Sequence, residues 1–242
     1  MRLLVSVRSA LEVVPALQGG ADIIDAKEPA NGSLGRVSPT ALHAITRRVP
    51  DQCALSIALG DLTRPAQVRD AFHQSYPARA GDTFVKLGFA GLASPVSIAA
   101  LLAEAVRLSG AVSGLQVVAV AYADHVRAGT VPLGDISDIA ADSGASGVLL
   151  DTSIKDGKDL FSWVSPLQLE GWIATIREKG LLAAVAGSLR AQSFAAACAA
   201  HPDVVGVRGA ACVGGRTGRI DRGRVARLRA LLPQAALSRR TG

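Results

Sequence analysis

Cysteine and histidine are scarce in this chain of 242 residues. Its three cysteines, Cys53, Cys198 and Cys212, lie far apart, and its four histidines are equally scattered. An odd number of cysteines with no Cys-x-x-Cys motif and no Cys/His cluster supports neither a disulfide framework nor a zinc site. We therefore expect buried or incidental thiols and no metal.

Aromatic residues are also few, at 4% of the chain, whereas proteins that bind single-stranded nucleic acid need aromatic side chains on which bases stack. The net charge of +6 arises at one end. Eight arginines and one aspartate, Asp221, follow residue 215, a local surplus of +7, so the first 215 residues sum to −1. A basic C-terminal end without aromatic residues is weak evidence for binding to a nucleic acid, and we predict no nucleic-acid partner.

Long apolar runs are missing as well. No stretch approaches the roughly eighteen uninterrupted apolar residues of a membrane-spanning helix. The first ten residues, MRLLVSVRSA, have too short an apolar segment and no small-residue cleavage site for a signal peptide. We expect a soluble, cytoplasmic protein with no membrane partner. The sequence leaves a homo-oligomer open, because it marks no apolar patch on an outer helix face.

Lysine is the most informative scarcity. The chain holds five lysines against 21 arginines, and Lys27, Lys86 and Lys155 fall where short apolar runs end. A guanidinium can replace an ammonium as a solubilising charge, but it stays protonated and cannot form an imine, so a site that needs amine chemistry must keep lysine. The pattern favours a Schiff-base or proton-transfer enzyme.

Eight short runs rich in valine, isoleucine, leucine and alanine recur along the chain, each followed by a segment with helical spacing. Near-continuous apolar strands that alternate with helices are typical of a parallel sheet covered on its faces. The expected strands cover residues 3–7, 22–27, 53–59, 84–89, 115–123, 147–153, 181–188 and 204–209. The expected helices cover residues 9–18, 39–48, 65–77, 95–109, 134–144, 166–179, 190–200 and 221–232.

Capping signals support these helices. Ser38, Ser94 and Ser165 each stand directly before a proline, which places a capping hydroxyl ahead of the first helical turn. Eight βα units in 242 residues predict an α/β fold, a single-domain (β/α)8 TIM barrel over residues 1–232 with a flexible C-terminal tail at 233–242. The alternative is a Rossmann-like doubly wound sheet, but no G-x-G-x-x-G motif follows the first strand.

Charged residues collect where these strands end, the face on which barrels carry their active sites. Those that we regard as catalytic candidates are Asp25, Lys27, Lys86, Asp151 and Lys155; Asp61 and Asp124 follow the third and fifth strands. Asp25 and Lys27 lie two residues apart and so share one face of their strand. The alternatives are a structural layer of ion pairs for Lys27 and Lys86, and an ordinary solvated charge run for Lys155.

The chemistry of such a cluster follows from crowding. Two ammonium groups that are close together and partly desolvated lower each other's pKa, which leaves one of them a free amine able to attack a carbonyl. Carboxylates such as Asp25 and Asp151 can then move protons during carbinolamine loss and enamine formation. The residues therefore predict a site like that of a class I aldolase.

Two glycine-containing loops supply the expected binding region. The seventh strand ends in Ala186, Gly187 and Ser188, and the eighth runs into VRGAAC and a further glycine-rich stretch. Barrels commonly bind phosphate through backbone N–H groups of these two loops. Each loop alone is explained by turn geometry, but together they favour a phosphorylated substrate.

Several segments resemble the (5-formylfuran-3-yl)methyl phosphate synthase family. They are ALQGGADIIDAKEPANGSLG at 16–35, VKLG at 85–88, YAD at 122–124, LLDTSIKDGKDLF at 149–161, AGS at 186–188 and VGVRGAACVGGRTGRID at 205–221. The resemblance implies a TIM-barrel carbon–oxygen lyase of methanofuran-type cofactor biosynthesis and one-carbon metabolism. It would join two molecules of glyceraldehyde 3-phosphate into a phosphorylated furaldehyde with loss of phosphate and water. No cofactor is implied.

The resemblance also implies roles for particular residues. Lys27 would form the Schiff base with a triose phosphate, and Lys86 would accept a proton, with Asp25, Asp151 and Lys155 in support. Phosphate contacts would fall on Gly187, Ser188, Arg208, Gly209 and Ala210. Two other functions stay open on the sequence: a class I aldolase-type lyase acting on another sugar phosphate, and a non-enzymatic sensor of a phosphorylated ligand.

Overall fold

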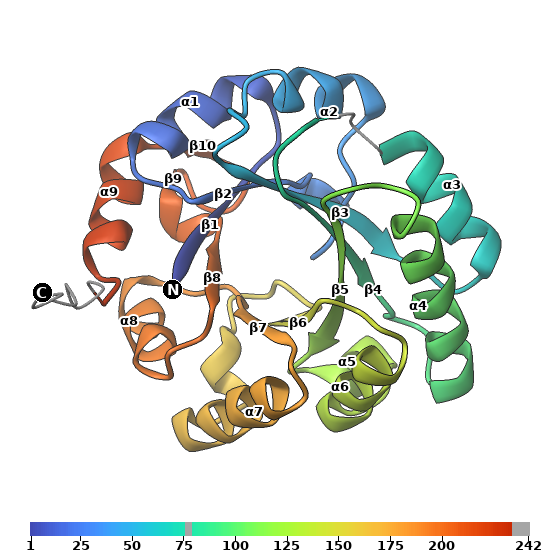
Figure 1. The fold of residues 1–242 in the computed structure, drawn as a ribbon. Helices are drawn as coiled ribbons and strands as arrows, with labels where there is room; N and C mark the ends of the chain where they lie inside the picture. The colour runs from blue at the N-terminus through green and yellow to red at the C-terminus, as the bar shows by residue number, and fades with distance from the viewer. Residues whose placement is uncertain (76–78, 234–242) are drawn as a thin grey trace, which may run out of the picture.

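The computed structural model describes residues 1–75 and 79–233. Eight parallel strands form one closed barrel in the order of the sequence, and helices surround it (Figure 1). The strands are β1 (Arg2–Val7), β2 (Ile23–Ala26), β3 (Ala54–Asp61), β4 (Thr83–Gly88), β5 (Leu115–Tyr122), β6 (Gly147–Asp151), β7 (Leu182–Val185) and β8 (Val204–Val207). Pairing of β8 with β1 closes the ring. The predicted TIM barrel is therefore confirmed.

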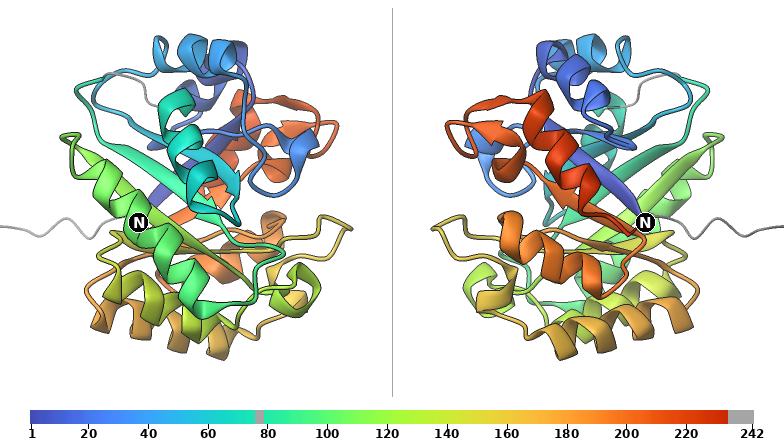
Figure 2. Two further views of the ribbon diagram at one scale, coloured as in Figure 1. Left: turned by 90° about the vertical axis from the view of Figure 1, so that its right-hand side faces the viewer. Right: turned by 90° about the vertical axis from the view of Figure 1, so that its left-hand side faces the viewer.

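The outer layer consists mainly of the helices that follow the strands (Figure 2). The α-helices are α1 (Ala10–Gln18), α2 (Pro39–Thr46), α3 (Pro65–Ser75), α4 (Pro95–Ser109), α5 (His125–Ala128), α6 (Leu133–Asp142), α7 (Pro166–Glu178), α8 (Ala191–Ala199) and α9 (Arg222–Ala230). Short 3-10 turns are η1 (Pro29–Asn31), η2 (Leu160–Ser162) and η3 (Gly209–Ala211). The predicted caps form: Ser38, Ser94 and Ser165 accept hydrogen bonds from backbone N–H groups in the first turns of α2, α4 and α7.

The core has two layers, because each strand is buried on both faces. One layer lies between the strands and the helices and includes Val5, Leu55 and Phe194. The other fills the barrel interior and includes Leu4, Ile23, Phe84 and Leu149. This double burial explains why the strands appear in the sequence as apolar runs rather than as an alternating pattern.

Some boundaries differ from the expectations. β7 ends at Val185 instead of residue 188, because the chain turns at Gly187 (φ +111°) and Ser188 (φ +54°). Helix α5 and the two-stranded hairpin of β9 (Cys212–Val213) and β10 (Arg219–Ile220) were not predicted. Residues 76 and 77 of the third expected helix, and all of the expected tail except Pro233, lie outside the described residues.

Within the described ranges, no helix is long and apolar enough to cross a bilayer. The same part of the chain brings together no group of three or more His, Cys, Asp or Glu side chains that could hold a metal ion. All three cysteines are buried and free.

Candidate active site

The charged cluster occupies the upper interior of the barrel because side chains alternate along each strand. Ile23, Phe84 and Leu149 belong to the apolar interior layer. Asp25, Lys86 and Asp151 follow them by two residues on β2, β4 and β6. A spacing of two keeps a side chain on the same face of its strand. Polar groups therefore form the next interior layer, nearer the carboxyl ends of the strands, as predicted.

Asp25 and Lys86 form a buried ion pair. The Lys86 Nζ lies 2.6 Å from the Asp25 Oδ1, and both side chains are almost fully buried. The Ser6 Oγ, from β1, donates a hydrogen bond of 2.7 Å to the Asp25 Oδ2. Burial alone would raise the pKa of Asp25, but the positive charges of Lys86 and Lys27 and the hydrogen bonds lower it below its usual value. Asp25 is therefore held as a carboxylate.

Asp151 and Lys155 form a second pair. The Lys155 Nζ donates hydrogen bonds to the Asp151 Oδ1, at 2.6 Å, and to the Thr152 Oγ1, at 3.0 Å. The Lys155 side chain is only 12% exposed, so its interpretation as a solvated charge is wrong. Burial opposes ionisation of Asp151, yet Lys155, Lys27 and the backbone N–H of Thr152 lower its pKa.

Lys27 stands between these pairs without a partner of its own. It is the residue after β2 and is 8% exposed. Among residues 1–75 and 79–233, no carboxylate lies within ion-pair distance of its Nζ. Desolvation lowers the pKa of Lys27 to about 8; Asp151 and Asp25 oppose this change, while Lys86 and Lys155 add to it. About a tenth of the Lys27 side chains are thus uncharged amines at pH 7, far more than for an ordinary lysine.

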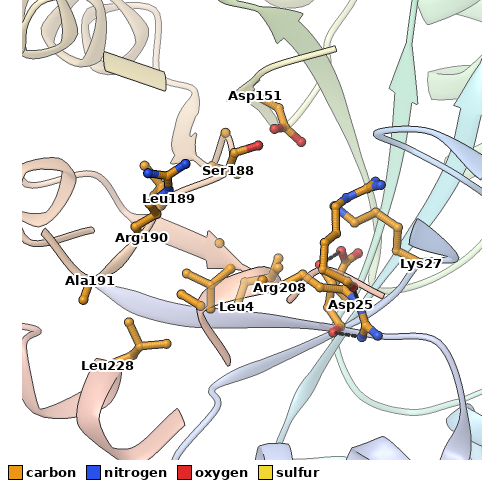
Figure 3. A pocket seen from close by; sticks show the side chains of 18 of the residues that line it. Leu4, Asp25, Lys27, Asp151, Ser188, Leu189, Arg190, Ala191, Arg208 and Leu228 are labelled. Atoms are coloured by element: carbon orange, nitrogen blue, oxygen red, sulfur yellow. Dashed lines mark hydrogen bonds between the residues drawn. The ribbon is translucent and has the colours of Figure 1, made fainter. Parts of the chain in front are cut away.

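A cavity of about 900 Å³ opens above the cluster. Figure 3 shows Lys27 and Asp25 at one end, Ala191 and Leu228 toward the other, and Leu4 between them. The volume is at the upper end of the range for small-molecule pockets, about 300–1,000 Å³, and exceeds what one triose phosphate needs.

The predicted phosphate loops also line this cavity. Gly187 and Ser188 follow β7, and Gly209 and Ala210 lie in η3 after β8. Gly187 and Ser188 both have positive φ, which turns the chain sharply at the cavity wall. A non-glycine residue in this conformation costs roughly 1 kcal/mol or more, and such positions cluster at functional sites. The structure brings both loops and the lysine cluster to one cavity.

Arg208 is different, because its guanidinium is fully used within the protein. Its five N–H donors bond to the Ser6 and Gly218 carbonyls, to the Arg216 carbonyl and to both carboxylate oxygens of Glu12. The side chain is 4% exposed. Arg208 lines the cavity but has no donor left for a ligand, so it joins β1, α1 and the β9–β10 hairpin.

The two other acidic residues near strand ends hold loops. Asp61 accepts hydrogen bonds from the Tyr122 hydroxyl, at 2.7 Å, and from the Ala90 N–H, at 3.0 Å. Asp124 accepts from the backbone N–H groups of residues 153 and 154, at 2.6 and 3.0 Å. The second arrangement fixes the loop that carries Lys155.

Sequence reasoning missed two residues of this site, Ser6 and Thr152. It placed Arg216 in the expected phosphate-binding stretch after the eighth strand but gave its side chain no role. Ser6 follows the interior residue Leu4 by two positions on β1, so strand alternation could have placed it beside Asp25. The Arg216 contacts arise because the β9–β10 hairpin lies against the loop after β2. Nothing in the local sequence signals that contact.

Comparison with solved structures supports the fold. The chain superposes on 3-hexulose-6-phosphate synthase from Salmonella typhimurium with a TM-score of 0.65 and 18% identity, covering 96% of this chain and 98% of that one. It also resembles phosphoribosyl anthranilate isomerase from Thermus thermophilus, with a TM-score of 0.61 and 14% identity, over 96% and 100% of the two chains. At these identities the likeness concerns the fold alone.

Sequence relatives are much closer. The chain is 38% identical over 235 residues to (5-formylfuran-3-yl)methyl phosphate synthase of Methanothermobacter thermautotrophicus, covering 96% of this chain and 99% of that protein. The corresponding protein of Methanocaldococcus jannaschii is 37% identical over 235 residues, with the same coverage. The sequence profile of the family described as 4-HFC-P synthase matches residues 3–229. The relatives are named synthases, and the chain belongs to this family of enzymes, the (5-formylfuran-3-yl)methyl phosphate synthases.

Proposed function

We propose that this enzyme condenses two molecules of glyceraldehyde 3-phosphate into (5-formylfuran-3-yl)methyl phosphate, with loss of inorganic phosphate and water. The observation that carries the proposal is the state of Lys27: a buried amine with a pKa of about 8 and no carboxylate partner among the described residues, in a cavity lined by phosphate-binding types of loop. The named relatives supply the product. We place the enzyme in the cytoplasm, as a lyase of methanofuran-type cofactor biosynthesis.

The reaction starts at the Lys27 amine. Its attack on the carbonyl of one triose phosphate gives a carbinolamine, which loses water to form an imine. The imine acidifies the neighbouring C–H bond, because the enamine formed on proton loss is stabilised by the nitrogen. The enamine carbon then attacks the aldehyde of the second triose phosphate.

The two ion pairs supply proton transfer around this nitrogen. Asp25 and Lys86 share a short contact of 2.6 Å on one side, and Asp151 and Lys155 share another of 2.6 Å. We assign to the Asp25–Lys86 pair the removal of the C–H proton, and to the Asp151–Lys155 pair the protonation of departing hydroxyl groups. Elimination of phosphate, ring closure with dehydration and hydrolysis of the C–N bond to Lys27 release an aromatic furan and the free amine, without any net oxidation or reduction.

Backbone N–H groups of the two loops after β7 and β8 are the proposed anchors for a substrate phosphate. Gly187, Ser188, Gly209 and Ala210 all line the cavity. Glycine is favoured at position 187 because φ is +111° and a Cβ there would lie 3.1 Å from the Leu160 Cβ.

Replacement of Lys27 by arginine tests the mechanism, since it keeps the positive charge but removes imine chemistry. We expect Lys27→Arg to lower furan formation by at least about a thousandfold, roughly 4 kcal/mol of barrier. The assay incubates the protein with glyceraldehyde 3-phosphate and follows an ultraviolet-absorbing furaldehyde together with inorganic phosphate. Turnover near the wild-type rate would rule the Schiff base out.

The same assay separates the other functions. An open-chain six-carbon product without furan would indicate an aldolase-type lyase acting on sugar phosphates. Ligand binding by the unmutated protein with no turnover would indicate a sensor. Borohydride reduction followed by peptide mapping shows whether Lys27 carries the substrate, but it does not distinguish the synthase from an aldolase.

A further inference from the structure

Arg216 is one of the arginines of the cavity wall to which the proposed mechanism gives no role. It lies in the β9–β10 hairpin, is half-buried, and lines the cavity. Its Nη1 donates to the Pro29 carbonyl and its Nη2 to the Gly32 carbonyl, each at 2.5 Å. The hairpin and the loop after β2 therefore lie side by side at the barrel mouth (Figure 2).

The hydrogen-bond capacity of Arg216 is not exhausted by these contacts. A guanidinium has five N–H donors. Within the described part of the chain, two of those of Arg216 are used, which leaves three, whereas Arg208 spends all of its five on protein acceptors. The two arginines look alike in sequence, but only Arg216 can offer donors to a ligand.

The charges around Arg216 also favour binding of an anion. The carboxylates that line the cavity are Asp25 and Asp151, and each is already paired with a lysine. In residues 1–75 and 79–233, Arg216 has no carboxylate within ion-pair distance. Burial lowers the pKa of Arg216 and the Asp151 carboxylate raises it, so the Arg216 guanidinium interacts electrostatically with a residue of the charged cluster. A partly desolvated cation without a counter-ion is costly until an anion binds.

We propose that Arg216 binds the phosphate group of the triose phosphate that forms the imine with Lys27. Its two carbonyl contacts, Pro29 and Gly32, lie two and five residues after Lys27, so the guanidinium sits over the loop that begins at the reacting amine. The substrate identity in this assignment rests on the proposed function. The loops after β7 and β8 then hold the second triose phosphate, and the cavity of about 900 Å³ has room for both.

The test compares Arg216→Gln with Arg219→Gln. Arg219 is an exposed arginine of β10, on the same hairpin but outside the cavity, and its replacement removes the same charge. Borohydride trapping at Lys27 is measured against the concentration of glyceraldehyde 3-phosphate and of unphosphorylated glyceraldehyde. We expect Arg216→Gln to raise the half-saturating concentration of the phosphorylated aldehyde at least about tenfold. It should leave glyceraldehyde unchanged, and Arg219→Gln should change neither.

The variant Ser33→Ala distinguishes phosphate binding from a purely structural role of Arg216. It removes another contact of the same loop, the 3.1 Å hydrogen bond between the Ser33 and Tyr122 hydroxyls, without removing a charge. If Ser33→Ala reproduces the selective loss for the phosphorylated aldehyde, or if Arg216→Gln weakens both aldehydes equally, Arg216 only positions the loop and the proposal is wrong. Arg216→Lys should recover part of the affinity. Circular dichroism confirms that each variant is folded.

Failure of the proposed function gives a different result. If the wild-type protein makes no furan but is trapped by triose phosphate, only the furan-forming reaction is lost and the Arg216 comparison stands. If it is not trapped at all, equilibrium dialysis with inorganic phosphate decides: Arg216→Gln must bind one phosphate fewer per chain than the wild type and Arg219→Gln, and equal binding would overturn the assignment.

Discussion

Lys27 and Lys86 differ in what lies within reach of their ammonium groups. Lys86 has Asp25 at 2.6 Å, whereas Lys27 has Asp25 and Asp151 only as more distant charges. Desolvation then dominates at Lys27 and lowers its pKa to about 8, with the neighbouring Lys86 and Lys155 charges adding to the effect. Identical residue types thus occupy different electrostatic environments, and the separate roles that we propose for these lysines depend on that difference.

The pH dependence of imine formation follows from this arrangement. The rate of borohydride trapping should rise with pH and reach half its maximum near pH 8, where half of the Lys27 side chains are neutral. Lys86→Met should move this midpoint upward by about one pH unit, because it removes a positive charge and leaves Asp25 without its partner. The comparison is Lys158→Met, outside the cavity, for which the midpoint should stay. A midpoint that moves downward in Lys86→Met would contradict the electrostatic account.

At the scale of elements, the strands and most helices could be predicted because their signals are local. Apolar runs gave the strands, and Ser38, Ser94 and Ser165 gave three helix starts that the structure contains. The hairpin of β9 and β10 could not be predicted, since each strand has only two residues and no periodicity to recognise. Its fold depends on contacts with distant parts of the chain.

The charged cluster of the site could also be predicted from a local signal, the alternation of side chains along each strand. The roles of Arg208 and Arg216 could not. Strand alternation puts Asp25, Lys86 and Asp151 in one interior layer from sequence alone. Two of the five Arg208 donors bind the carboxylate of Glu12, 196 positions away, and no spacing rule connects the two residues. Such a partnership arises only when the ring of strands closes.

The Arg208–Glu12 pair should therefore hold elements together. Arg208 Nη1 lies 2.7 Å from Glu12 Oε2, and both side chains are under 10% exposed. Glu12→Gln leaves the buried guanidinium without its counter-charge and should lower the free energy of unfolding by about 3 kcal/mol. Urea denaturation at pH 7 measures this loss. Glu104→Gln, which breaks contacts with the exposed Arg69 and Arg107, should change little, and an equal effect of the two substitutions would contradict a central role for Glu12.

At the scale of the whole molecule, the barrel interior has an apolar layer at one depth and a charged layer at another. Leu4, Ile23, Phe84 and Leu149 fill the lower interior with apolar side chains. The charged layer lies directly above, at the base of the cavity. Closure of β8 on β1 fixes both layers at once, so the stability of the ring supports the unfavourable burial of an amine at its mouth.

The burial of Lys27 makes the free energy of unfolding depend on pH. The unfolded chain holds the Lys27 proton up to a pKa of 10.5, whereas the folded protein releases it near 8. Between these values the unfolded state binds more protons, so the free energy of unfolding rises with pH; below pH 8 the folded state carries the whole cost. A displacement of this size corresponds to at most about 3 kcal/mol.

Lys27→Met should consequently stabilise the barrel while abolishing imine formation. It removes the desolvated charge and adds apolar contact, but it also deprives Asp25 and Asp151 of a charge that lowers their pKa values, so we expect a net gain of about 1–2 kcal/mol at pH 7. Lys27→Arg, which keeps a charge in the same place, should show no gain. The gain should shrink toward pH 10, because the wild-type amine is then neutral as well. A methionine variant less stable than the wild type at pH 7 would mean that Lys27 acts mainly as a counter-ion for the two carboxylates.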